Sequence, residues 1–120
     1  MKENLIKART FAFALDVVKV YKLLTTDQRE YVLSKQLLRC GTSIGAMVSE
    51  SEHAESKADF IHKLSIAQKE ANETAYWLNL LVQSGYLSDI GYQSLYSEII
   101  QIRKILSIIV TTKKSLQNAN

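Results

Sequence analysis

The chain of 120 residues contains no proline, and this absence restricts its fold more than any other feature of the sequence. Proline interrupts helices because it lacks a backbone N–H and its ring clashes with the preceding turn. Glycine occurs only four times, whereas an all-β sandwich needs many tight turns that use both residues. Because 47% of the residues are apolar, the composition favours one helical domain over residues 1–120.

The composition also bears on compartment and charge. A single cysteine excludes an internal disulfide, and we find neither a signal peptide nor eighteen uninterrupted apolar residues, so we expect a cytoplasmic protein without a membrane span. Residues 1–48 hold eight Lys/Arg and four Asp/Glu, residues 49–98 hold three and eight, and residues 99–120 hold four and none. This asymmetry fits solvated helix faces, a basic surface for nucleic acid, or complementary faces that join subunits.

Apolar residues recur every three or four positions in four stretches, which predicts helices at about 10–24, 28–50, 57–84 and 89–115. Their main seams include Phe13 and Val17, then Leu37, Cys40 and Ile44, then Leu64, Ala67, Ala71 and Leu78, and finally Leu95, Ile99, Ile102 and Leu106. Phe11, Leu15 and Val18 form a second stripe on the first helix. Short connections favour an all-α, up-down-up-down antiparallel four-helix bundle.

Local signals predict where helices end and approach one another. Capping boxes are predicted at Thr25 with Gln28, more loosely at Asp27 with Glu30, and at Ser56 with Asp59. A Schellman ending is predicted at Gly85 with Tyr86. Gly41 and Gly45 lie one turn apart, and two glycines within a helix indicate that another helix approaches closely there.

The last helix has more apolar residues than one seam requires. Ile100, Ile105, Ile108 and Val110 point away from its seam, so its apolar directions span roughly three quarters of the circumference. A helix that is apolar nearly all round is buried on more than one side. We therefore expect Ile100, Ile105 and Ile108 to contact another copy of the chain.

No arrangement of residues predicts a catalytic, cofactor or metal site. Di-metal bundles use Glu-x-x-His motifs from facing helices, and the candidate ligands here are Glu50, His53, Asp59 and His62, with Asp16 and Glu98. Both His motifs lie at one connection instead of at mid-helix, which argues against a metal centre. Cys40 is expected to be a small core residue, Glu70 and Glu73 to lie on a solvated face, and no nucleotide-binding or CxxC motif is present.

Basic residues supply the remaining candidates for function. They are Lys35 and Arg39, one turn apart, and Arg103, Lys104, Lys113 and Lys114 on the last helix. Such cations can contact phosphates, and their repetition around a symmetric oligomer would strengthen binding.

The sequence resembles the four-helix-bundle proteins encoded in 23S rRNA intervening sequences. The resemblance is carried by residues 30–39 and 41–46 and by the later motifs 56–60, 64–67, 69–71, 73–74, 76–78 and 85–86. Most of these residues pack helices, so they are specific for a fold and not for a chemistry. Two positions depart from the family pattern, which commonly has Asn where this chain has Met47 and Glu where it has Ser49. We expect Met47 to extend the apolar seam.

The resemblance implies a small bacterial bundle with no enzymatic activity, whose relatives form a homopentameric barrel. One branch resembles the accessory variability protein of diversity-generating retroelements, which binds a reverse transcriptase and nucleic acid. We therefore expect a self-assembling bundle that presents its basic residues to RNA, DNA or a nucleic-acid enzyme. The alternatives are a structural homo-oligomer that binds no nucleic acid and a metal-dependent enzyme.

Overall fold

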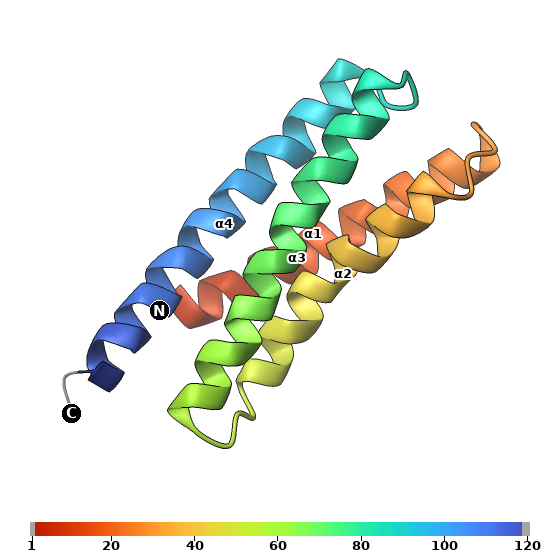
Figure 1. Cartoon of the computed structure of the whole chain (residues 1–120). Helices are drawn as coiled ribbons and strands as arrows, with labels where there is room; N and C mark the ends of the chain where they lie inside the picture. The colour runs from red at the N-terminus through yellow and green to blue at the C-terminus, as the bar shows by residue number, and fades with distance from the viewer. Residues whose placement is uncertain (1, 119–120) are drawn as a thin grey trace.

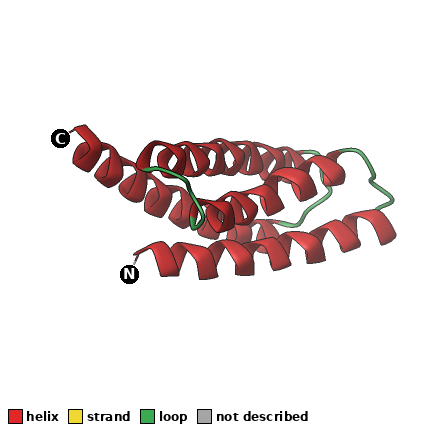
Figure 2. Ribbon diagram, turned by 90° about the horizontal axis from the view of Figure 1, so that it is seen from below, coloured by secondary structure: helices red, strands yellow, loops and turns green. Residues whose placement is uncertain are grey.

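The computed structural model describes the backbone of residues 2–118 and the side chains of residues 4–116. It contains α1 (Lys2–Thr26), α2 (Leu33–Ser51), α3 (Lys57–Gln83) and α4 (Asp89–Asn118), and no strand occurs in this part of the chain. Consecutive helices run in opposite directions, so both termini lie at one end of a rod of 53 × 22 × 20 Å (Figure 1, Figure 2). The predicted up-down-up-down antiparallel four-helix bundle is confirmed.

The predicted seams meet inside the bundle, since each seam places apolar side chains on one helix face. α2 and α4 each pack against both α1 and α3. Fully buried side chains include Phe13, Val17, Leu37, Ile44, Leu64, Leu78, Ile99, Ile102 and Leu106. Cys40 is also fully buried, and Met47 packs against the same core, so both were predicted correctly.

Both ends of α3 follow the local signals. The Ser56 hydroxyl accepts a hydrogen bond from the Asp59 N–H at 3.0 Å, which caps the helix N-terminus. At the other end Gly85 adopts φ +88°, a conformation that favours glycine. The N–H groups of Gly85 and Tyr86 then donate to the carbonyls of Val82 and Leu81, which is the predicted Schellman ending.

The first connection differs from the prediction. α1 begins at Lys2 instead of residue 10, and α2 begins at Leu33 instead of residue 28. The expected capping box at Thr25 and Gln28 is absent, because the Thr25 hydroxyl donates back to the Tyr21 carbonyl within α1. The missed part of α1 includes Ile6, which is 1% exposed and extends the core stripe by nearly two turns.

Glu30 caps α2, but it does so from a position before the helix and not within a first turn that follows Asp27. Its carboxylate accepts hydrogen bonds from the N–H groups of Val32, Leu33 and Ser34 at 3.1, 3.0 and 2.6 Å, and Ser34 Oγ donates to the Glu30 carbonyl. Burial opposes ionisation of this carboxyl, but the hydrogen bonds together outweigh it and lower the pKa of Glu30 from its ordinary 4.5. The positive φ of Arg29, 55°, allows the chain to turn into this cap.

Replacing Glu30 by alanine should lower the free energy of unfolding by about 1–2 kcal/mol at pH 7, because three N–H groups lose their acceptor. The lowered pKa means that this contribution is present above pH 4.5 and is lost as the pH falls through the folded-state pKa. Urea denaturation should therefore show the gap between wild type and Glu30→Ala closing in acid. The exposed Glu55 gives the control Glu55→Ala; an equal loss in both variants would contradict the capping role.

Gly41 and Gly45 bring α2 close to α1, as the sequence predicts. A Cβ on Gly41 would lie 2.9 Å from both methyl carbons of Val17, and one on Gly45 would lie 3.3 Å from the Thr10 carbonyl oxygen. These separations are shorter than ordinary van der Waals contacts. The two glycines therefore set how closely the first two helices pack.

Candidate nucleic-acid interface

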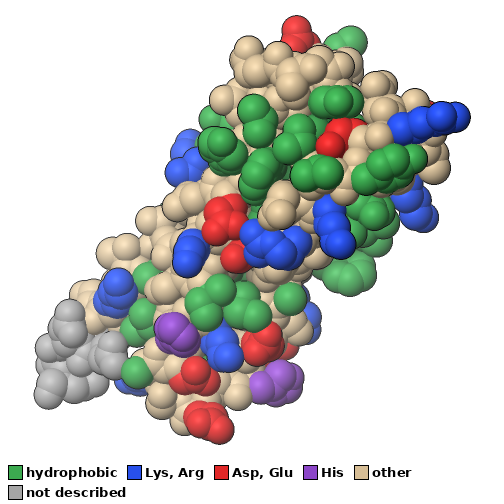
Figure 3. Space-filling model, turned by 45° about the vertical axis from the view of Figure 1, so that its right-hand side comes forward, with side chains coloured by type: hydrophobic (Ala, Val, Ile, Leu, Met, Phe, Trp, Pro, Cys, Tyr) green, Lys and Arg blue, Asp and Glu red, His purple; other side chains and the backbone are tan. Residues whose placement is uncertain are grey.

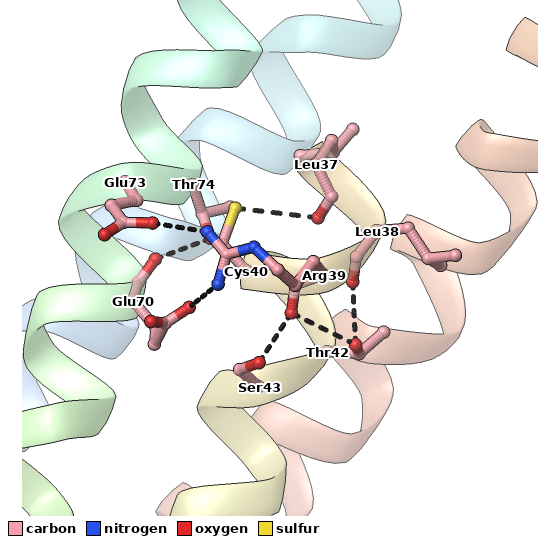
Figure 4. A network of polar contacts seen from close by, with 9 residues as sticks. All are labelled: Leu37, Leu38, Arg39, Cys40, Thr42, Ser43, Glu70, Glu73 and Thr74. Atoms are coloured by element: carbon pink, nitrogen blue, oxygen red, sulfur yellow. Dashed lines mark hydrogen bonds and ion pairs between the residues drawn. The ribbon is translucent and has the colours of Figure 1, made fainter. Parts of the chain in front are cut away.

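Arg39 lies between two carboxylates of α3 and not on an open basic surface. Its guanidinium contacts Glu70 Oε2 at 3.2 Å and Glu73 Oε2 at 2.7 Å (Figure 4). We expected Glu70 and Glu73 to lie on a solvated face. In the structure both form ion pairs with Arg39 and so connect α3 with α2. Their combined negative charge opposes any contact of Arg39 with phosphate.

Lys35 is one turn before Arg39, so it lies on the same face of α2, but its surroundings differ. It is exposed, and it forms no ion pair with any side chain that the structure describes. Figure 3, with the α2 side turned forward, shows acidic and basic side chains next to one another near mid-height. Hydrophobic side chains gather towards the end that holds the α1–α2 and α3–α4 connections. This face therefore carries mixed charge.

Arg103 and Lys104 lie in a different setting, an open hollow of about 530 Å³ between α3 and α4. The hollow is lined by Gln68 and Asn72 from α3 and by Ile100, Arg103, Lys104 and Ser107 from α4. No carboxylate is among these lining residues. Within the described part of the chain, none of the five polar side chains has a hydrogen-bond or ion-pair partner. We call this feature the α3–α4 hollow.

The other two cations of α4 are separated from each other. Lys113 is partly buried, with Nζ 5.4 Å from the centroid of the Phe60 ring. Lys114 is exposed, and it lies eleven residues after Arg103, which places it on the same side of α4. The side of α4 that lines the hollow therefore also carries Lys114, whereas Lys113 lies over the Phe60 ring.

The isoleucines predicted to contact another copy differ in their exposure. Ile100 is partly buried in the α3–α4 hollow, Ile105 packs against the core, and Ile108 is 46% exposed. Val110 is itself a core residue, 4% exposed. Several of the apolar residues of α4 that lie outside its main seam therefore pack within the bundle itself.

Exposed hydrophobic side chains are also present on α1. Phe11 is 66% exposed and Leu15 is 51% exposed, while Phe13 and Val17 on the opposite side are buried. Beside them, an apolar hollow between α1 and α2 is lined by Lys7, Ala8, Phe11, Ala14, Thr42, Gly45, Ala46 and Ser49. We call this the α1–α2 face. In the sequence, this face corresponds to the stripe of Phe11, Leu15 and Val18 on the first helix. The sequence alone did not show whether this stripe is exposed or buried in the core.

Three of the candidate metal ligands, Glu50, His53 and Asp59, line one hollow beside the connection between α2 and α3. No three His, Cys, Asp or Glu side chains among the described residues are placed to hold a metal ion. Glu50 pairs with Lys63 at 3.2 Å, and Glu98 pairs with Arg9 at 3.6 Å. Burial raises the pKa of the Cys40 thiol, which leaves it protonated and unreactive at neutral pH.

Comparison with known proteins gives one family and a close structural relative. A family model described as 23S rRNA-intervening sequence protein matches residues 2–108. A crystal structure from Bacteroides thetaiotaomicron, described as a protein with unknown function from the S23 ribosomal protein family, is 49% identical with a TM-score of 0.91. The match covers 92% of this chain and 99% of that one. No curated protein matches.

In the part of the chain that the structure describes, no helix is long and apolar enough to cross a membrane.

Proposed function

Since this chain belongs to the 23S rRNA-intervening sequence protein family, we propose that it is a non-enzymatic binding module. Its α3–α4 hollow contacts the phosphates of nucleic acid through Arg103 and Lys104. The remaining basic candidates are secondary, because Arg39 is paired with two carboxylates and Lys113 lies over Phe60.

The observation that carries this proposal is the charge of the α3–α4 hollow. Two cations line it without a carboxylate, and neither forms an ion pair with any described residue. Arg and Lys side chains in this state are free to replace the counterions around a phosphate backbone. The segment 99–120 also carries four cations and no acid, so this part of α4 adds positive charge on the α4 side of the hollow.

Reversing both charges, Arg103→Glu with Lys104→Glu, should weaken binding of a fluorescein-labelled RNA about 10- to 30-fold and should lower the slope of log K against log salt by about two. Fluorescence anisotropy between about 50 and 200 mM salt measures both quantities. The affinity falls because two phosphate contacts are replaced by repulsion. Unchanged affinity and slope would show that the hollow does not bind RNA.

The matched control reverses two exposed lysines of α1, Lys19→Glu with Lys22→Glu. It makes the same change in net charge on another face of the bundle. A small effect of the control supports a local site at Arg103 and Lys104. Equal effects of both pairs would contradict that site, because binding would then follow the net charge of the protein.

Self-association is a second candidate function, and the exposed Phe11 and Leu15 favour it. The exposed side chains of one copy can pack against a different surface of the next copy, and a contact of this kind can close into a ring. In this hypothesis the chain forms a structural homo-oligomer, for which the family resemblance suggests a pentamer, and nucleic acid need not bind. Light scattering with and without RNA separates the two candidates, and a monomer at all concentrations would contradict the second.

A further inference from the structure

We infer that the α3–α4 hollow accepts an unpaired nucleotide, so that the protein prefers single-stranded to double-stranded RNA. This inference rests on the proposed function and specifies which form of nucleic acid the hollow accepts. It comes from the unequal chemistry of the two helices that line the hollow.

The two sides of the hollow carry different groups. Gln68 and Asn72 are one turn apart on α3, so they lie on one line and present only side-chain amides. The opposite side, on α4, presents the cations of Arg103 and Lys104 together with the Ser107 hydroxyl. Positive charge is therefore confined to the α4 side of the hollow, and the α3 side presents only neutral amides.

A nucleotide has the same division of chemistry. Its phosphate is recognised by Arg and Lys, and the edge of its base is recognised by amides, which both donate and accept hydrogen bonds. Ile100 is partly buried in the hollow and offers an apolar surface for the face of a base. The hollow's volume of about 530 Å³ lies within the usual range of small-ligand sites, about 300–1,000 Å³.

The groups on α3 distinguish a single strand from a duplex. Packed helices have axes about 8–10 Å apart, so the groove between α3 and α4 is narrow compared with a nucleic-acid duplex. A duplex could place its phosphates on Arg103 and Lys104, but its bases are stacked and paired. Only an unstacked base can turn its edge towards Gln68 and Asn72.

The test compares one labelled RNA strand, free and annealed to its complement, by fluorescence anisotropy. The variant Gln68→Ala with Asn72→Ala removes the amides of the hollow. The matched control, Asn79→Ala with Gln83→Ala, removes two exposed α3 amides with the same spacing that are outside the hollow. Thermal melting of each variant establishes that it is folded.

We expect the single strand to bind roughly 10-fold more tightly than the duplex, and the loss of Gln68 and Asn72 to remove most of this preference. The salt slope should stay unchanged in that variant, because neutral amides release no counterions. Equal binding of both RNA forms, or an equal effect of the control variant, would overturn this inference. The proposed function would still stand in that case if the charge reversal Arg103→Glu with Lys104→Glu weakened RNA binding. If that charge reversal also had no effect, both would fail.

Discussion

Replacing Phe11 and Leu15 by aspartate should leave the protein as a 13.6 kDa monomer, if the proposed self-association uses the α1–α2 face. Both side chains are more than half exposed on the α1–α2 face, and burying such a side chain at an interface contributes about 1.5–3 kcal/mol. Aspartate removes this contribution and would place a charge in an apolar contact. Since Phe13 and Val17 face the core from the other side of α1, the bundle itself should remain folded.

Light scattering across a range of protein concentrations measures this change, and circular dichroism checks the helix content. The informative control is Ile108→Asp, because Ile108 is the exposed member of the three isoleucines first expected at an interface. If α4 formed the contact, this control would release monomers and the α1 variant would not. That result would contradict the assignment of self-association to the α1–α2 face.

Assembly and RNA binding are linked if both proposals are correct. Each copy would contribute one α3–α4 hollow, and several hollows on one particle raise the apparent affinity for a long strand by increasing the effective concentration. A monomeric variant with substitutions on α1 should then bind a long RNA more weakly than the wild type, although its hollow is unchanged. Binding of a short RNA that fills one hollow should be unaffected.

The parts of the fold that were predictable depend on short stretches of sequence. The Ser56 cap involves four consecutive residues and the Schellman ending at Gly85 involves six, so their pattern is visible without tertiary structure. The core seams were predictable for a similar reason, since helical spacing assigns residues such as Leu37 and Ile44 to one face.

The remaining features depend on how the helices pack against one another. Helical spacing places Arg39 on a face of α2, but only the packing of α2 on α3 brings it to Glu70 and Glu73. In the same way, Phe11 and Phe13 belong to two stripes of one helix. Which stripe is buried depends on the position of α2 and α4 around α1.

The hollow at Arg103 and Lys104 was predicted only in part. The clustering of cations on the last helix was visible in the sequence, but the two amides on α3 were not connected with them. Gln68 and Asn72 are 35 and 31 residues before Arg103 in the chain, so no local pattern relates them. The antiparallel pairing of α3 and α4 brings them to one surface.

Substitution of Gly41 by valine should lower the free energy of unfolding by about 3 kcal/mol, because it overpacks the contact between α1 and α2. Even a single Cβ on this residue would lie 2.9 Å from both methyl carbons of Val17. Val17 is fully buried, and its branched side chain has one strongly preferred rotamer in a helix. The two helices must therefore move apart, and urea denaturation measures the resulting loss of stability.

Alanine at the same position gives a quantitative test in case the valine variant does not fold. Gly41→Ala gains about 1 kcal/mol of helix propensity, so its net loss should be smaller than that of valine. Combining it with Val17→Ala removes the clashing methyl groups, and the double-mutant cycle should show a favourable coupling of about 1–2 kcal/mol. The control Gly91→Ala, whose Cβ would lie 3.6 Å from Ser88 Oγ, should stabilise the protein. Additive effects of Gly41→Ala and Val17→Ala would contradict a direct clash between these residues.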